Sequence, residues 1–310
     1  MAFLRAFGRW LPERIVNNLE VGGKVGADET WIRNVSGIDE RRYADPQDRV
    51  PDMAARAGAN CLENAGMKPA ELSMVMVASG SAEHAFPGPA SETAKLLGCG
   101  DIPAIDVPMA SAGSLFAMSL ASRLTEALGP ILVIGAEKMS RIICREPLER
   151  GVVPLFGDGA GACLVDPERG PAAIVDSVLS SDGSFADDLQ LDPDRPLQMN
   201  GRSVILQASR KIPAAINAVL DKNSVTHSEV GVFLLHQANQ NLIVRVAEAV
   251  GVEAARFFSN IHRFGNTSSA SMLIAASEWA ETCGFRPNVP VVFAAFGAGF
   301  HWGALLARGT

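Results

Sequence analysis

Short runs of apolar residues alternate along the chain with longer segments in which apolar residues recur at helical spacing. Three of the runs predict buried strands, at residues 72–78, 131–135 and 289–295. Two of the longer segments, residues 54–65 and 115–128, predict helices. Alternation of this kind is typical of an α/β protein whose sheets are covered by helices.

Two segments, one in each half of the chain, have the same order of features. Residues 106–121 contain a turn of small residues and then an apolar helix, and the strand at 131–135 follows. Residues 265–277 repeat this order before a strand at 291–295. This repeat suggests an internal duplication, although α/β sequences also offer such matches by chance. Six small residues in the two turns would let helix and backbone approach closely: Ala110, Ala112, Gly113, Ser268, Ser269 and Ala270.

Composition excludes several classes of protein. The 310 residues are 48% hydrophobic, which is too apolar for a disordered chain, and the net charge of −7 without a basic run argues against nucleic-acid binding. No apolar run reaches the roughly 18 residues that suggest a membrane span. Arg5 and Arg9 interrupt the first apolar stretch, unlike a signal peptide. The five cysteines form no CxxC pair, so we expect reduced thiols, no zinc site and a cytoplasmic location.

Three polar residues lie between strand-like runs and helical patterns. Ser111 would stand at a helix N-terminus, either as a cap or as a nucleophile whose adduct is stabilised by backbone N–H groups. His236 follows an apolar run, where a lone histidine is more often structural, and Asn266 is in a position typical of turns. Met109 occupies the place of the first glycine of a GxSxG elbow, which argues against an α/β-hydrolase.

Two glycine-rich runs add further candidates. Residues 296–303 follow a strand and could aim backbone N–H groups at an oxyanion, or form a tight hairpin. Residues 155–161 lack the Lys-Ser/Thr pair of a P-loop and do not fit GxGxxG, so no nucleotide site is expected there.

Taken together and in order, these segments resemble the β-ketoacyl-acyl-carrier-protein synthase III group of the thiolase superfamily. Each motif alone is weak, and their shared order over nearly the whole chain is specific. The motifs that carry the resemblance are residues 37–41, 84–87, 156–161, 181–184, 236–239, 265–268 and 296–300.

The resemblance implies a five-layered αβαβα fold with two pseudo-symmetric halves, residues 1–165 with the nucleophile and residues 166–310 with the histidine and asparagine. It also implies a homodimer and a buried site in which Ser111, His236 and Asn266 are catalytic. The backbone N–H groups of Ser111 and Ala298 would form the oxyanion hole.

The implied reaction is acyl transfer from an acyl-coenzyme A or acyl-carrier-protein thioester, followed by decarboxylative condensation with a malonyl thioester. Coenzyme A would be part of a substrate, and no metal or redox cofactor is implied. Transfer of the acyl group to an alcohol or amine is the alternative, because it needs the same acyl-enzyme. The residues implied in binding the substrate are Trp31, Phe86, Arg150, Phe156, Met199, Gly201, Ile205 and Phe296.

The nucleophile position departs from the family, because Ser111 stands where the family has cysteine. A serine hydroxyl does not ionise as a thiol does and needs a general base, for which His236 is the matched candidate. Three interpretations stay open: a native serine nucleophile, an engineered Cys→Ser replacement, and a non-catalytic subunit of a heteromeric synthase.

Other departures concern the donor and the acyl pocket. Val35 and Asn241 stand where the family often carries arginine, so we expect altered donor or carrier specificity. Ile205 stands where phenylalanine is common, which would widen the pocket. Four other cations could compensate for the missing arginines: Arg33, Arg202, Arg210 and Lys211.

Overall fold

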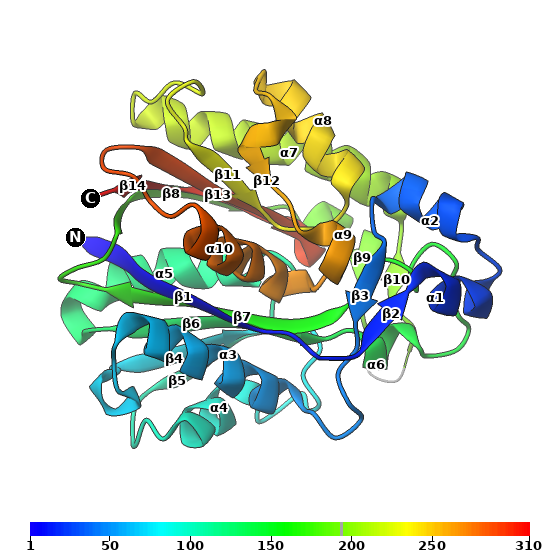
Figure 1. The fold of residues 1–310 in the computed structure, drawn as a ribbon, viewed down its shortest axis with the longest axis horizontal. Helices are drawn as coiled ribbons and strands as arrows, with labels where there is room; N and C mark the ends of the chain where they lie inside the picture. The colour runs from blue at the N-terminus through cyan, green and yellow to red at the C-terminus, as the bar shows by residue number, and fades with distance from the viewer. Residues whose placement is uncertain (193–194) are drawn as a thin grey trace.

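The computed structural model describes residues 1–192 and 195–310 (Figure 1). Within them, ten strands form one sheet in the order β12-β11-β13-β14-β8-β1-β7-β6-β4-β5. The first half of the chain supplies β1 (Ala2–Trp10), β4 (Met74–Ala78), β5 (Ala104–Val107), β6 (Ile131–Lys138) and β7 (Asp158–Asp166). The second half supplies β8 (Ala172–Ser181), β11 (Val232–Leu235), β12 (Phe257–Phe258), β13 (Pro290–Gly297) and β14 (His301–Gly309).

The two halves of the sheet have the same topology. Read from each edge to the centre, the strands run β5-β4-β6-β7-β1 and β12-β11-β13-β14-β8. In both halves the outer three strands are parallel and the inner two pair antiparallel. β1 and β8 join the halves by an antiparallel pairing.

Helices cover both faces of each half of the sheet, which gives the predicted αβαβα layers (Figure 1). Helices α3 (Val50–Ala65) and α4 (Pro89–Leu97) cover the outer face of the first half, and α7 (Gly201–Lys222) and α8 (Gln240–Val250) cover that of the second. Helices α5 (Gly113–Leu128) and α10 (Ser271–Thr282) form the middle layer. A separate apolar cluster fills each of these layers, so each helix buries its apolar residues against a sheet face.

The five elements predicted from the apolar pattern are present, with shifted ends. α3 begins four residues earlier than predicted, because Pro51 fits the first helical turn and the Asp52 carboxylate accepts the Arg49 N–H. The predicted strands correspond to β4, β6 and β13, and the predicted helices to α3 and α5.

Glycines let the middle helices approach the sheet closely. A Cβ at Gly135 of β6 would lie 2.2 Å from the Ser269 carbonyl oxygen, and one at Gly161 of β7 would lie 2.7 Å from the Ile274 nitrogen. Only glycine leaves room for backbone at these distances. The close approach at Gly161 therefore serves helix packing.

Smaller elements gather at one end of the sheet (Figure 1). Most of them contribute to an apolar cluster that includes Val16, Ile32, Phe156 and Leu197. No helix in the described part of the chain is long and apolar enough to cross a membrane. The smaller elements at this end of the sheet are β2 (Ile15–Asn17), α1 (Asn18–Val25), α2 (Glu29–Ser36), β3 (Glu40–Arg42), α6 (Ser140–Ile143), β9 (Leu189–Gln190), β10 (Gln198–Met199) and α9 (Ile261–Phe264).

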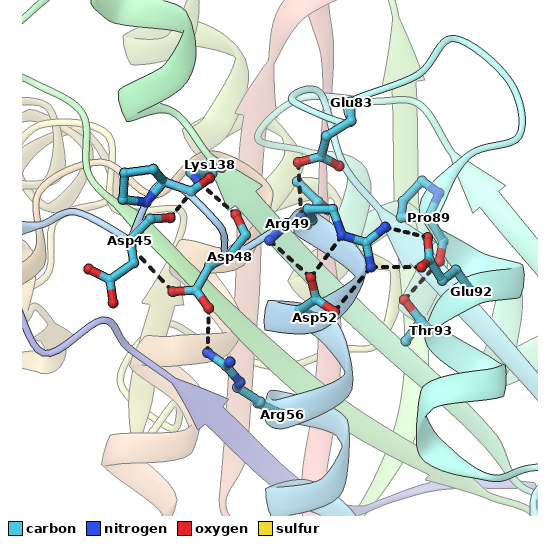
Figure 2. A network of polar contacts seen from close by, with 12 residues as sticks. Asp45, Asp48, Arg49, Asp52, Arg56, Glu83, Pro89, Glu92, Thr93 and Lys138 are labelled. Atoms are coloured by element: carbon cyan, nitrogen blue, oxygen red, sulfur yellow. Dashed lines mark hydrogen bonds and ion pairs between the residues drawn. The ribbon is translucent and has the colours of Figure 1, made fainter.

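A polar network fixes the end of β6 to the loop before α3 (Figure 2). The buried Lys138 ammonium donates to the carbonyl oxygens of Asp45 at 2.7 Å, Pro46 at 3.1 Å and Asp48 at 2.6 Å. Arg49 then bonds Glu92 of α4. All three ammonium hydrogens have acceptors, so backbone carbonyls hold this buried cation, which has no carboxylate partner among the residues that the structure describes.

Candidate active site

A narrow cavity of about 140 Å³ opens at the carboxyl ends of the parallel strands. Residues that directly follow four of these strands line it: Gly80 after β4, Met139 after β6, His236 after β11 and Ala298 after β13. Both halves of the chain therefore contribute to one site. Open α/β sheets bind ligands at this edge because loops from several strands meet there.

Ser111 lies in the turn between β5 and α5 and lines the cavity. Its φ is +62°, a left-handed conformation that costs energy for a non-glycine residue. The N-cap of α5 is Ala112, and no side chain caps this helix, so Ser111 is not the cap that the sequence left open. A Cβ at Gly297 would lie 2.2 Å from the Ala110 carbonyl oxygen, so a glycine there gives the Ser111 turn its room.

His236 follows β11 and is 7% exposed. Its backbone N–H donates to the Ala294 carbonyl of β13, and its Nδ1 lies 2.6 Å from Ser271 Oγ. Burial lowers the pKa of the imidazole to about 4, so the ring is neutral at neutral pH. Within the described chain Nε2 has no hydrogen-bond partner and is free for a ligand in the cavity.

Asn266 is placed by Gly265, whose φ of +64° reverses the chain after α9. The Asn266 N–H donates to the Leu155 carbonyl, and its own carbonyl accepts from Gly157. Its Oδ1 accepts the Ser268 N–H at 2.8 Å, which is the turn-type bond that asparagine favours. The amide nitrogen has no partner among the described residues, so a donor remains at the cavity that Asn266 lines.

Sequence reasoning missed the residues that hold these three. The Ser111 N–H donates to Ser268 Oγ at 3.0 Å. Ser269 bonds the fully buried carboxylate of Glu137 through its N–H and its hydroxyl. Glu137 also accepts from the hydroxyls of Ser79 and Ser81 and the N–H of Gly80. The serine-rich turn at 266–271 was the available signal, but a single sequence does not show its partners.

The predicted substrate residues separate into two groups. Phe156, Met199, Gly201, Ile205 and Phe296 line the cavity together with Ala298. Apolar side chains from α7 and the β9–β10 hairpin complete the wall, so the cavity suits an apolar chain. None of the five cysteines lines it, and the hydroxyl side chains that do are Ser111 and Ser268.

Phe86 does not line this cavity, contrary to the sequence-based expectation. Its side chain is 87% exposed on the loop between β4 and α4. That loop is held beside β5, because Asp106 Oδ1 accepts the Ala90 N–H at 2.7 Å and packs against Gly88. Within one chain the loop therefore carries Phe86 to the edge of the sheet.

Trp31 and Arg150 lie outside the cavity and contact each other. The Arg150 guanidinium carbon is 4.4 Å from the centre of the Trp31 ring, a cation–π distance. Trp31 packs against the apolar cluster that includes Leu197, and Leu197 also lines the cavity. The pair therefore contacts the cluster that forms part of the cavity wall.

The two positions at which the family often has arginine form a neutral contact here. Asn241 of α8 donates to the Asn34 carbonyl at 2.9 Å, and Asn239 donates to the Val35 carbonyl at 2.8 Å. These bonds tie the start of α8 to the end of α2. Asn239 also lines the cavity, so the contact borders it.

Two of the four cations considered as replacements, Arg33 and Lys211, are engaged in ion pairs. Arg33 pairs with Asp39 at 2.5 Å. Lys211 pairs with Asp182 at 3.0 Å. Arg202 lies in the first turn of α7 beside the cavity-lining Gly201, so it is the nearest of them in sequence to the cavity. Among the described residues, no group of three or more His, Cys, Asp or Glu side chains could hold a metal ion.

Comparison with known proteins gives matches over nearly the whole chain. Residues 105–183 match the family model "3-Oxoacyl-[acyl-carrier-protein (ACP)] synthase III", and residues 220–308 match the model of its C-terminal part. The chain is 33% identical over 303 residues to a β-ketoacyl-[acyl-carrier-protein] synthase III of Listeria welshimeri, covering 97% of this chain and 96% of that protein. It is 32% identical over 308 residues to the Staphylococcus saprophyticus enzyme, covering 98% of each.

Solved structures agree with the sequence matches. The 3-oxoacyl-[acyl-carrier-protein] synthase III of Aquifex aeolicus VF5 superposes with a TM-score of 0.95 at 30% identity, over 99% of this chain and 100% of that one. The priming β-ketosynthase of the R1128 polyketide pathway superposes with a TM-score of 0.92 at 29% identity, over 100% and 96%. The chain belongs to the β-ketoacyl-acyl-carrier-protein synthase III family, with its thiolase-like fold and its acyl-transferring activity.

Proposed function

We propose that the chain transfers an acyl group from a coenzyme A or carrier-protein thioester to Ser111. The acyl group then condenses with a malonyl thioester, which loses CO₂, to give a β-ketoacyl product. The family membership supports a decarboxylative condensation, because the relatives are named β-ketoacyl-acyl-carrier-protein synthases. The assignment of the acyl group to Ser111 is our own.

One observation carries the proposal: Ser111, His236 and Asn266 line the same narrow cavity. The turn at Ser111 is left-handed, and its side chain is not used as a helix cap. A hydroxyl on a strained turn and an imidazole that line one cavity are the components of a nucleophile and its base.

His236 is suited to the role of general base. Its neutral imidazole can accept the Ser111 proton at neutral pH, because burial lowers its pKa to about 4. Ser271 Oγ orients the ring through Nδ1. Ser271 Oγ also accepts the Gln237 N–H, and its second lone pair can accept an Nδ1–H, which leaves the Nε2 lone pair facing the cavity.

Among the described residues the Asn266 amide nitrogen has no partner and its oxygen accepts the Ser268 N–H, so the group it can offer a ligand is the N–H donor. A donor at this place suits the enolate that forms when the malonyl thioester loses CO₂. The protonated His236 would be the second donor to that enolate. Both groups would thereby stabilise the negative charge as it develops.

The donor site is expected to differ from a strongly cationic one. The contact between α2 and α8 is neutral, since Asn239 and Asn241 bond backbone carbonyls there. The Trp31–Arg150 pair remains as a cation–π element near the cavity wall. We therefore propose that the site attracts the phosphates of coenzyme A more weakly than it would with two further arginines. We also propose that the reaction requires no metal or redox cofactor.

Transfer of the acyl group to an alcohol or amine is the alternative. The same three side chains would serve it, because both reactions proceed through one acyl-enzyme. It would need an acceptor in place of the malonyl thioester and would release no CO₂.

We also propose that the chain works as a homodimer. β5 is an edge strand of the sheet, and Ile105 on it is 40% exposed. The exposed Phe86 lies on the adjoining loop. A second copy could cover these apolar groups, and light scattering of the purified chain would measure the mass of the particle.

The condensation is tested by incubating the protein with a series of acyl-coenzyme A donors and a malonyl thioester, on coenzyme A and on a carrier protein. We expect CO₂ and a β-ketoacyl product in equal amounts, and neither with Ser111→Ala. Ser224→Ala is a matched control, because Ser224 is exposed and also has a left-handed φ, of +52°. Transfer of the acyl group without CO₂ release would instead favour the alternative.

A further inference from the structure

The segment from Asn266 to Ser271 contacts all three site residues. Ser268 connects two of them, because its Oγ accepts the Ser111 N–H at 3.0 Å and its own N–H donates to Asn266 Oδ1 at 2.8 Å. Ser271 contacts His236 at 2.6 Å. Ser268 is therefore placed between the proposed nucleophile and the proposed enolate donor.

The hydroxyl hydrogen of Ser268 has no acceptor in the described part of the chain. Its neighbour Ser269 differs in this respect, because the Ser269 hydroxyl donates to Glu137 and the Ala78 carbonyl. Ser268 is 2% exposed and lines the cavity, so its unused hydroxyl hydrogen is at the site.

The same contact occupies an expected oxyanion donor. A hole made of the Ser111 and Ala298 N–H groups needs both to be free, but the Ser111 N–H already donates to Ser268 Oγ. A hydroxyl that accepts one hydrogen bond becomes a better donor of another. The chain from the Ser111 N–H through the Ser268 hydroxyl can therefore reach an oxygen in the cavity.

We propose that Ser268 is a catalytic residue, whose hydroxyl donates a hydrogen bond to the oxyanion formed when Ser111 is acylated. This inference rests on the proposed function. In that step Ser111 Oγ bonds to the thioester carbonyl carbon, and the C=O π electrons move onto the oxygen. The Ser111 proton passes to His236. Collapse restores the C=O bond and breaks the C–S bond, and the thiolate takes the proton from His236. Ser268 keeps its proton throughout.

The surroundings hold the Ser268 hydroxyl in position. Its φ of +47° is left-handed, so the turn is fixed rather than relaxed. Next to it, Ser269 is bonded twice to the Glu137 carboxylate, which is fully buried and also accepts from the loop that contains Gly80. A donor fixed before the reaction stabilises a developing charge without reorganisation.

Ser268→Ala tests the proposal, because alanine removes the hydroxyl and meets the same left-handed backbone. The rate of acyl transfer to the protein is followed by rapid quenching and intact-protein mass, with Ser224→Ala as control. We expect acylation of Ser268→Ala to be about 10²-fold slower, as for the loss of one oxyanion donor. The melting temperature shows whether both variants are folded.

A second readout separates a chemical role from a structural one. In the acyl-enzyme made with a ¹³C-labelled carbonyl, loss of a donor should move the ester C=O stretch to higher wavenumber in Ser268→Ala and not in Ser224→Ala. Ser268→Ala also frees the Ser111 N–H. If that N–H is the true donor, the variant will acylate as fast as the wild type or faster, with an unchanged or lower stretch, and the proposal is overturned.

Failure of the proposed function and failure of the Ser268 role give different experimental results. If the wild type forms no adduct at Ser111 with any donor, the proposed function is wrong and the role of Ser268 is rejected with it. If the wild type is acylated and Ser268→Ala matches it in rate and spectrum, only the role of Ser268 is rejected.

Discussion

Ser111 and Ser268 occupy matching places in the two halves of the molecule. Each lies in a turn just before a middle-layer helix, α5 or α10, and each has a left-handed φ, +62° and +47°. Their neighbours differ. Ser111 is flanked by Ala110 and Ala112, whereas the turn around Ser268 carries side chains that bond His236, Glu137 and the Ser111 backbone.

This difference shows that the same unit, a turn followed by a middle-layer helix, has a different role in each half. In the turn at Ser111 the flanking side chains are only those of alanine, so the Ser111 hydroxyl can project into the cavity. The second turn is polar and fixes the groups that surround the nucleophile. Its bond to Glu137 of β6 shows that the second half is held by the first. Neither half has a complete site alone.

The largest expected effect on this comparison comes from His236→Ala. Acylation of Ser111 should slow by ~10²–10⁴-fold, because a general base is lost. Single-turnover mass measurements give the rate. An unchanged rate would mean that Ser111 is activated without His236. The contact between Ser271 and His236 would then have no part in acylation.

Asn266→Ala should separate the two chemical steps. We expect condensation to fall by about 10²-fold, as for the loss of one donor to an oxyanion, and acylation to fall less. Acylation is measured with the acyl donor alone, and condensation after adding the malonyl thioester. Equal damage to both steps would contradict the role assigned to Asn266.

The buried imidazole should make stability depend on pH. The His236 pKa is lowered to about 4, against about 6.5 when unfolded. The contribution of His236 to the free energy of unfolding is therefore fully present above pH ~6.5. It is lost as the pH falls toward 4, and the total loss is about 3 kcal/mol. Denaturant unfolding of the wild type and His236→Gln at several pH values would measure it, and parallel pH profiles would argue against a buried neutral ring.

Gly297→Ala tests whether the Ser111 turn needs the space beside Gly297. Its Cβ would lie 2.2 Å from the Ala110 carbonyl oxygen, so we expect a loss of ~1–3 kcal/mol in the free energy of unfolding and slower acylation. Gly151→Ala is the control, because its Cβ would have nothing within 4 Å. Equal stability of the two variants would show that the Ser111 turn yields easily.

Much of the fold could be predicted from the sequence because it depends on local patterns. The apolar runs marked β4, β6 and β13, and the signals for the start of α3 were also present in Pro51 and Asp52. The order of the strands in the sheet could not be derived from such patterns, and the layered fold with two similar halves came from the family resemblance. The boundary between residues 165 and 166 stays a prediction, although the strand order repeats on either side of it.

The site was predictable only in part. The resemblance brought Ser111, His236 and Asn266 together, and the cavity contains all three. Glu137 and Ser268 were missed because their partners are 132 and 157 residues away in the chain. The substrate-binding role of Phe86 stays a prediction, because Phe86 is exposed on a loop within one chain and a sequence does not show where such a loop lies.

The central claim is that Ser111 carries the acyl group, and intact-protein mass tests it most directly. The wild type and Ser111→Ala are incubated with a series of acyl-coenzyme A donors, and modified peptides are then mapped. We predict a mass gain equal to one acyl group, located on Ser111 and missing in the variant. No gain with any donor, or a gain that Ser111→Ala retains, would contradict the account.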